Sequence, residues 1–180
     1  MDDQTLIIAV IGAILLAVLY RAFFVDGKKS DDGRIDGKHI TEDQLFQILS
    51  KFTPQKINKK QVERGIQKEL GLVLKNAITL VTDEYGLEGV NGRNIDFDIG
   101  YKKFGIELKV AKSLLKTAEW DRFQSQLRHY LTHYKDDNLI LIVFGSKSEH
   151  KETIMHSVEV FCKEKKIHFI YKNIEYNDSE

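Results

Sequence analysis

A strict alternation of polar and apolar residues between Arg93 and Val110 is the feature that most constrains the fold of this 180-residue chain. Alternation with a period of two is typical of half-buried β-strands, and here it runs on both sides of a turn at Tyr101–Gly105. One face is apolar and collects Ile95, Phe97, Ile99, Ile106, Leu108 and Val110. The other face carries only Asp96, Asp98, Glu107 and Lys109. The pattern predicts an antiparallel hairpin with one highly charged face.

The register of this hairpin decides which charged side chains lie opposite each other, because directly opposed residues share a face. With a two-residue loop at Lys102-Lys103, Asp98 lies opposite Glu107. Asp96 then lies opposite Lys109, and any other loop with an even number of residues keeps all four on one face. Carboxylates this close repel unless a cation neutralises them, and a hard cation with oxygen ligands suits the set. An ordinary amphipathic hairpin with one solvated face is the alternative.

Asp96 on the first strand and Glu107-Leu108-Lys109 on the second resemble the signature of the PD-(D/E)XK nuclease superfamily. Ile95 stands where that family often has proline. The resemblance covers about Gln61–Gly145. It implies an α/β fold with a restriction-endonuclease-like core, in which a helix, three strands, a helix and a strand follow one another.

Hydrophobic periodicity along the chain predicts the same order of elements. The opening helix follows Asn58-Lys-Lys-Gln61, which resembles a capping box. The later elements are expected at Ile78–Tyr85 (strand), the hairpin, Thr117–Lys135 (helix), Leu139–Gly145 (strand), Glu149–Lys166 (helix) and Ile167–Tyr171 (strand). The continuous apolar run Leu139–Gly145 predicts a strand that is buried on both faces.

The resemblance also implies a metal site that binds one or two Mg²⁺ ions, with Mn²⁺ as a substitute. Its expected oxygen ligands are the carboxylates of Asp96 and Glu107, the carbonyl of Leu108, and the carboxylate of Glu63 on the opening helix. Magnesium prefers carboxylates together with water and substrate phosphate, which suits so sparse a set. Asp98 is either a further ligand or a support for the ligands, and the sequence leaves both roles open.

The resemblance further implies that Lys109 positions the attacking water and offsets charge that develops on the phosphate. Two positions near the site have alternatives. On the opening helix Glu69 could take the place of Glu63, and on the helix after the hairpin Gln126 is the expected polar residue, with Gln124 behind it. For each of these residues an ordinary solvated helix face is the competing interpretation.

The N-terminal stretch predicts a membrane anchor. Leu6–Leu19 carries no charged residue, and the apolar character continues to Val25. A helix of about 20 such residues spans a bilayer core. Basic residues follow the stretch at Arg21, Lys28, Lys29, Arg34 and Lys38, so the positive-inside rule predicts a single-pass protein with its C-terminal domain in the cytoplasm.

Three regions are therefore expected: the anchor at residues 1–25, a flexible polar linker at 26–38, and an α/β nuclease-like domain at 39–180. A capping box at Thr41-Glu-Asp-Gln44 predicts a short helix at the start of that domain. Its length suits one hydrophobic core. The lone cysteine, Cys162, has apolar neighbours and is expected to be a buried thiol, which fits a reducing compartment.

The formal net charge is zero, which excludes a global basic field that would attract nucleic acid. Local basic residues do gather at and after the hairpin: Lys102, Lys103, Lys109, Lys112 and Lys116. The sequence predicts a membrane-anchored, metal-dependent nuclease that acts on DNA more readily than on RNA. The alternative is a catalytically inactive, membrane-tethered module that binds nucleic acid or protein. Homodimer formation, endo- or exonuclease action and sequence specificity stay open.

Overall fold

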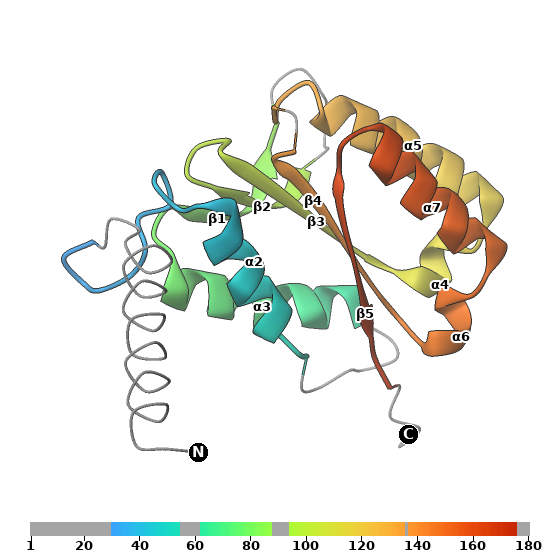
Figure 1. Cartoon of the computed structure of the whole chain (residues 1–180), viewed down its shortest axis with the longest axis horizontal. Coiled ribbons are helices and arrows are strands. Elements are labelled where there is room, and N and C mark those ends of the chain that lie inside the picture. The colour runs from blue at the N-terminus through green and yellow to red at the C-terminus, as the bar shows by residue number, and fades with distance from the viewer. Residues whose placement is uncertain (1–29, 55–61, 88–93, 136, 176–180) are drawn as a thin grey trace, which may run out of the picture.

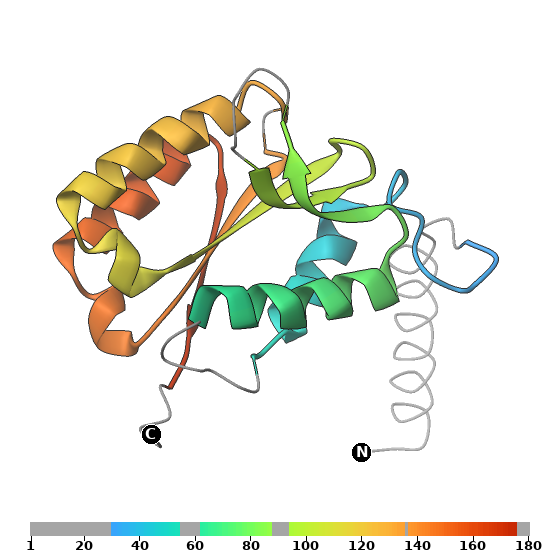
Figure 2. The same cartoon turned by 180° about the vertical axis from the view of Figure 1, so that it is seen from behind.

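The computed structural model of the chain describes residues 30–54, 62–87, 94–135 and 137–175, which form a mixed α/β domain (Figure 1). A five-stranded sheet lies between helices on its two faces, as the two opposite views agree (Figure 2). The helices are α2 (Glu42–Lys51), α3 (Val62–Ala77), α4 (Ala111–Leu114), α5 (Thr117–Tyr130), α6 (Lys147–His150) and α7 (Thr153–Glu164). The strands are β1 (Val81–Gly86), β2 (Asn94–Ile99), β3 (Phe104–Val110), β4 (Leu139–Gly145) and β5 (His168–Asn173).

The strands lie side by side in chain order, β1-β2-β3-β4-β5. β1, β2 and β3 form an antiparallel meander, whereas β3, β4 and β5 are parallel. The parallel connections need crossovers, and α5 and α7 supply them. The predicted succession of helix, three strands, helix and strand is thus present as α3, β1 to β3, α5 and β4.

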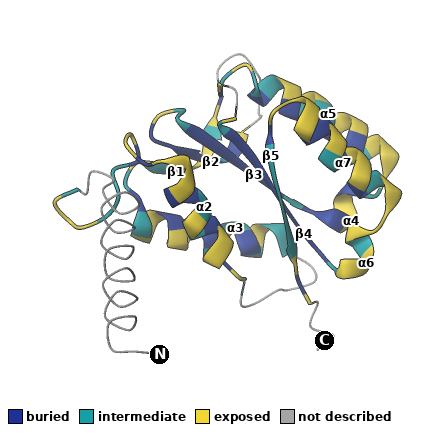
Figure 3. Ribbon diagram, in the orientation of Figure 1, coloured by how far each residue is buried: buried dark blue, intermediate teal, exposed yellow. Residues whose placement is uncertain are grey.

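Each face of the sheet packs against its own hydrophobic core. One core lies under α2 and α3 and includes Leu45, Leu70 and Phe97. The other lies under α5 and α7 and includes Trp120, Leu127 and Met155. All seven residues of β4 are buried, which confirms the strand predicted to be covered on both faces (Figure 3).

The predicted boundaries of several helices are wrong. The helix expected through Lys135 ends at Tyr130, but Leu131 and Tyr134 continue in turns and still pack into the second core, so the apolar periodicity outlasts the helix. The single helix expected over Glu149–Lys166 is two helices. A capping box in which the Ser146 hydroxyl accepts from the Glu149 amide begins α6, and α7 begins afresh three residues after α6 ends.

Within the described part of the expected linker, residues 34–37 are packed against the domain rather than free. Ile35 forms a parallel bridge with Ile78, and its amide donates to the carbonyl of Ala77 at 2.9 Å. Gly37 lies so close to the turn that follows β2 that a Cβ on Gly100 would meet the Gly37 carbonyl oxygen. The contact is long-range, so local composition gave no sign of it. The capping box at Thr41 is present as predicted.

The predicted membrane anchor at residues 1–25 and the Asn58–Gln61 capping box lie outside the described residues. Within the described ranges, no helix has the length and apolar character needed to cross a bilayer.

The hairpin between β2 and β3 turns through four residues, Gly100–Lys103, rather than through Lys102-Lys103 alone. Gly100, Tyr101 and Lys102 adopt left-handed backbone conformations with φ of 66°, 58° and 67°. The longer turn sets Asp98 opposite Gly105, not opposite Glu107. The loop is still even in length, and the same register carried further sets Asp96 opposite Glu107.

The strand pairing between β2 and β3 ends at Phe97 and Ile106, because β2 then departs from its partner. Ile95, expected on the same face as Phe97, instead packs into the core under α5, where its Cδ1 lies over Gly105. The prediction of one apolar face for Ile95, Phe97 and Ile99 is therefore wrong at Ile95. The departure of β2 opens the hairpin at the level of Asp96.

Candidate active site

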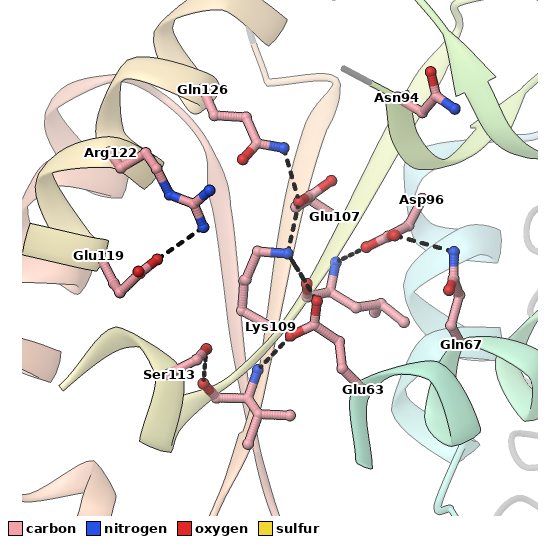
Figure 4. A network of polar contacts seen from close by, with 12 residues as sticks. Glu63, Gln67, Asn94, Asp96, Glu107, Lys109, Ser113, Glu119, Arg122 and Gln126 are labelled. Carbon is pink, nitrogen blue, oxygen red and sulfur yellow. Dashed lines mark hydrogen bonds and ion pairs between the residues drawn. The ribbon is translucent and has the colours of Figure 1, made fainter. Parts of the chain in front are cut away.

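Polar side chains from four elements meet where the hairpin opens (Figure 4). Strand β2 contributes Asp96, β3 contributes Glu107 and Lys109, α3 contributes Glu63 and Gln67, and α5 contributes Gln126. Glu63 and Gln67 are four residues apart, so they lie on one face of α3, the face toward the sheet. The structure thus brings together five of the predicted site residues: Asp96, Glu107, Lys109, Glu63 and Gln126.

Where β2 separates from β3, the half-buried carboxylate of Asp96 takes the place of a β2 carbonyl as acceptor for a β3 amide. Its Oδ2 accepts from the amide of Leu108 at 2.6 Å, and its Oδ1 accepts from Gln67 Nε2 at 3.1 Å. Desolvation raises the pKa of Asp96 to about 6, against the lowering effects of the Lys109 charge and the Leu108 amide. The sequence pattern did not single out Gln67.

Glu107 is the most deeply buried acid of the site, with 2% of its surface exposed. Its Oε1 lies 3.0 Å from Lys109 Nζ and accepts from Gln126 Nε2 at 3.3 Å. Its Oε2 is buried and has no hydrogen-bond partner among the described residues. Desolvation raises the pKa of Glu107 to about 8, with a further rise from the charge of Asp96 and an opposing effect of Lys109. A buried carboxylate oxygen without a donor is unfavourable unless a cation or a proton occupies it.

The Lys109 ammonium lies at the centre of the charged groups. Its Nζ is 3.0 Å from Glu63 Oε1 and from Glu107 Oε1, and it donates to the Leu108 carbonyl at 2.9 Å. Burial lowers the pKa of Lys109, but the charges of Glu107, Glu63 and Asp96 outweigh burial and raise it. The lysine is therefore a fixed positive charge. The carbonyl of Leu108, predicted as a metal ligand, is thus occupied by Lys109.

Of the two glutamates left open on α3, the structure brings only Glu63 to the site. Its Oε2 accepts from the amide of Val110 at 3.4 Å, in addition to the ion pair with Lys109. Glu69 instead lines a groove of about 500 Å³ between α2 and α3. On α5, Gln126 reaches Glu107, whereas the Gln124 side chain accepts from Arg128.

Asp98, predicted as a ligand or a support, lies away from these groups. It is 1% exposed, and its Oδ1 accepts from the Tyr134 hydroxyl and from the Lys102 amide, both at 2.8 Å. Desolvation raises its pKa, although both hydrogen bonds act against the rise. Asp98 thus fixes the four-residue turn to the segment after α5.

Tyr130 belongs to the site and was missed as a site residue. Its hydroxyl accepts from Gln126 Nε2 and donates to the carbonyl of Asn94 at 2.7 Å. This bond ties α5 to the start of β2 and holds the Gln126 amide toward Glu107. The four-residue spacing of Gln126 and Tyr130, which puts both on one helix face, could have revealed the pair.

The donor set fits a hard cation, although its carboxylates are held by Lys109 rather than clustered around an empty centre. Among the described residues, no three His, Cys, Asp or Glu side chains form a metal-binding group. The unpartnered oxygen of Glu107, the carboxylate of Asp96 and the Leu108 carbonyl are nonetheless all oxygen donors, and Asp96 and Leu108 are joined by a hydrogen bond between β2 and β3. Mg²⁺ commonly takes one or two carboxylates and completes its shell with water and phosphate oxygens. The oxygen donors present are therefore of the kind that Mg²⁺ takes in proteins.

A cleft of about 160 Å³ leads from these groups to the surface of α5. Glu63, Lys109, Ser113, Arg122 and Gln126 are among the residues that line it. The cleft gives solvent and a ligand access to Lys109.

No family model, curated protein or solved structure matches the chain.

Proposed function

We propose that the chain is a membrane-anchored, metal-dependent nuclease of the PD-(D/E)XK type that hydrolyses phosphodiester bonds, in DNA rather than in RNA. The observation that carries the proposal is the buried Glu107 carboxylate, whose Oε2 has no donor among the described residues although Asp96 and Lys109 lie beside it. A buried carboxylate oxygen without a donor lowers the stability of the fold, so a purely structural role does not account for it. The order of elements and the resemblance of Glu107-Leu108-Lys109 to the family signature support the same conclusion.

Asp96 and Glu107, with the Leu108 carbonyl, would hold Mg²⁺ or Mn²⁺, and Glu63 would complete the set. A metal ion in such a site polarises the scissile phosphate, lowers the pKa of a bound water and stabilises the leaving oxygen. Hydrogen bonds within the protein hold the proposed ligands in position before a metal binds. The Leu108 amide and Gln67 fix the carboxylate of Asp96, and Gln126 fixes one oxygen of Glu107.

Lys109 has two roles in this mechanism. Before substrate binds, it neutralises Glu63 and Glu107 through contacts of 3.0 Å. Because its charge is fixed, it can then donate to a phosphate oxygen or orient the attacking water while negative charge develops on the phosphate. Tyr130 acts through Gln126, as a positioning residue.

The anchor at Leu6–Val25 would hold this site at the cytoplasmic face of a membrane, next to DNA and Mg²⁺. The basic residues that follow the apolar stretch support that orientation. The folded domain follows closely, because residues from Arg34 onward are already packed against the end of α3 and the segment that follows it. Such an anchor would therefore hold the domain on a short connection rather than on a long tether.

Cleavage of plasmid and end-labelled DNA by the full chain in detergent, with Mg²⁺, Mn²⁺ or EDTA, tests the proposal. We expect cleavage with either metal, none with EDTA, and none by Glu107→Gln. Glu69→Gln is the matched control, because Glu69 is also an acid on α3 but lies in the groove between α2 and α3. Cutting by Glu107→Gln at the wild-type rate would contradict the proposal. DNA binding by the wild type without cleavage would favour the inactive binding module.

A further inference from the structure

Two clefts adjoin the site from opposite sides, and each contains exposed basic side chains outside the set of residues proposed for hydrolysis. Figure 4 shows Asp96 and Gln67 on one side of Glu107 and Lys109, and Arg122 with Glu119 on the other. The first cleft lies beside α3 and β1, and the second lies beside α5. We call them the α3 cleft and the α5 cleft.

The α5 cleft, of about 160 Å³, carries Arg122 at its mouth. Arg122 lies one helical turn before Gln126, so its side chain leaves α5 on the same face as the residue that contacts Glu107. Its guanidinium donates to Glu119 at 2.7 Å, and its side chain is 76% exposed. An ion pair this exposed contributes little to stability. A phosphate can replace the carboxylate, because a guanidinium binds both in the same two-pronged manner.

The α3 cleft, of about 250 Å³, is lined by Arg64, Gln67 and Lys68 together with Asp83 and Glu84 of β1. Gln67 also donates to Asp96, so the cleft reaches the site directly. Arg64 and Lys68 are four residues apart and follow Glu63 and Gln67 by one position each. They therefore form a second row on α3, turned from the sheet toward solvent, and both are exposed. Of the two acids in the cleft, Asp83 is paired with Lys75 at 2.5 Å.

We propose that the two clefts are the two halves of one track for a single strand of nucleic acid. Arg64 and Lys68 would contact phosphates on one side of the scissile bond, and Arg122 would contact a phosphate on the other. This inference rests on the proposed nuclease function and names the substrate form that the site accepts. Both clefts contain acidic as well as basic side chains, so the proposed phosphate contacts depend on Arg64, Lys68 and Arg122 individually. Basic side chains along the backbone are the usual way in which proteins bind single strands without reading their sequence.

The depth of the site favours a single strand over a duplex. Lys109, whose side chain is 18% exposed, lines a cleft of only about 160 Å³, and Glu107, 2% exposed, lies behind it with its Oε1 3.0 Å from Lys109 Nζ. A phosphodiester must enter this recess between α3 and α5 to approach both residues. A flexible single strand can bend inward, whereas the backbone of a stiff double helix stays on the outer surface.

The test uses the full chain in detergent, with Glu107→Gln present so that bound DNA stays intact. Fluorescence anisotropy measures the affinity for one labelled oligonucleotide, as a single strand and as a blunt duplex, over a range of salt concentrations. Arg122→Gln and the double variant Arg64→Gln/Lys68→Gln should each weaken single-strand binding severalfold. For every phosphate that a variant can no longer bind, the slope of log affinity against log salt should become shallower by about 0.7.

Two further variants separate a direct interaction with phosphate from a general effect of charge. Glu119→Gln should strengthen binding, because it frees Arg122 and removes a negative charge from the cleft. The matched control, Lys51→Gln/Lys163→Gln, removes two exposed charges on α2 and α7 and should leave the slope unchanged.

Unchanged slopes in the Arg64, Lys68 and Arg122 variants would overturn the track, as would tighter binding of the duplex or no binding of the single strand. The proposed function is judged separately, by Mg²⁺-dependent cleavage with Glu107 intact. If the wild type cleaves DNA while these variants bind normally, the track alone is wrong. If the wild type never cleaves DNA, the nuclease proposal itself fails.

Discussion

Two buried carboxylates of the same hairpin, Asp98 and Glu107, differ in how completely the fold satisfies them. Asp98 is 1% exposed and accepts hydrogen bonds from the Tyr134 hydroxyl and the Lys102 amide. Glu107 is 2% exposed, yet its Oε2 has no donor among the described residues. The first acid holds a turn in place. The second is held through one oxygen only, by Lys109 and Gln126.

The sequence pattern does not distinguish the two acids, since both occupy the charged face of an alternating strand. The fold separates them through the length of the turn. A four-residue turn sets Asp98 opposite Gly105, and the two strands separate beyond the pair of Phe97 and Ile106, next to Asp96 and Glu107. A pattern of charges thus marks the hairpin, but only the hydrogen bonds show which of its acids retains an unpartnered oxygen.

The largest effect expected from this comparison is on catalysis. Glu107→Gln and Asp96→Asn should each lower the initial rate of DNA cleavage by about 1,000-fold or more, because each removes a charged ligand from the proposed metal site. Neither should unfold the protein, since each relieves repulsion between crowded carboxylates. Asp98→Asn, measured below its own melting temperature, should cleave within severalfold of wild type. Equal losses in all three variants would erase the distinction between Asp98 and Glu107.

Lys109→Ala should lower the cleavage rate by about 100-fold, because the variant loses the charge that faces the developing negative charge on the phosphate. Metal binding should be largely retained, since the carboxylates and the Leu108 carbonyl remain. Cleavage rates and metal titration on the same preparation distinguish these effects. A variant that cleaves normally would leave Lys109 as no more than a counter-ion for Glu63 and Glu107.

Substitution of Asp98 should change the stability of the protein rather than its cleavage rate. Asp98→Ala should lower the free energy of unfolding by about 2–3 kcal/mol, because the Tyr134 hydroxyl and the Lys102 amide both lose their acceptor in a buried place. Urea denaturation measures the change. Tyr134→Phe is the partner variant, and the two changes together should be less than additive since they remove one shared hydrogen bond.

The stability of the metal-free protein should fall as pH rises from about 4.5 to about 8. The pKa of Glu107 is raised to about 8 and that of Asp96 to about 6, so the folded protein binds more protons than the unfolded chain in this window. The free energy of unfolding then decreases with pH, by an amount on the order of a few kcal/mol. Thermal melts in EDTA measure the slope. Glu107→Gln should flatten most of it, and a slope of the opposite sign would contradict the account of this acid.

Local patterns predicted the elements of the fold well, because each has a clear physical signature. The capping box at Thr41, the helical spacing in Val62–Ala77 and the apolar run Leu139–Gly145 all correspond to observed elements. Asp96, Glu107 and Lys109 were found for the same reason, since alternation fixes the face of a strand side chain.

Features that depend on contacts between distant residues were missed. Tyr101 and Lys102 adopt left-handed backbone conformations in the turn, and these residue types do not usually indicate such conformations. The predicted length of the turn and the predicted register of the hairpin were therefore wrong. Ile95 changes core because β2 leaves β3, and the docking of residues 34–37 depends on the close approach of Gly37 and Gly100. Tyr130 was missed for a different reason: its apolar ring fits the helix core, and only its hydroxyl reaches the site.

Calorimetric titration of the full chain with Mn²⁺ in detergent tests the central claim most directly, without dependence on the choice of substrate. The unpartnered oxygen of Glu107 is the proposed cation ligand, whereas Asp98 is already satisfied. Wild type and Asp98→Asn should bind Mn²⁺ with similar affinity, and Glu107→Gln should lose most of that affinity. Binding by Glu107→Gln equal to wild type, or its loss in Asp98→Asn alone, would contradict the account.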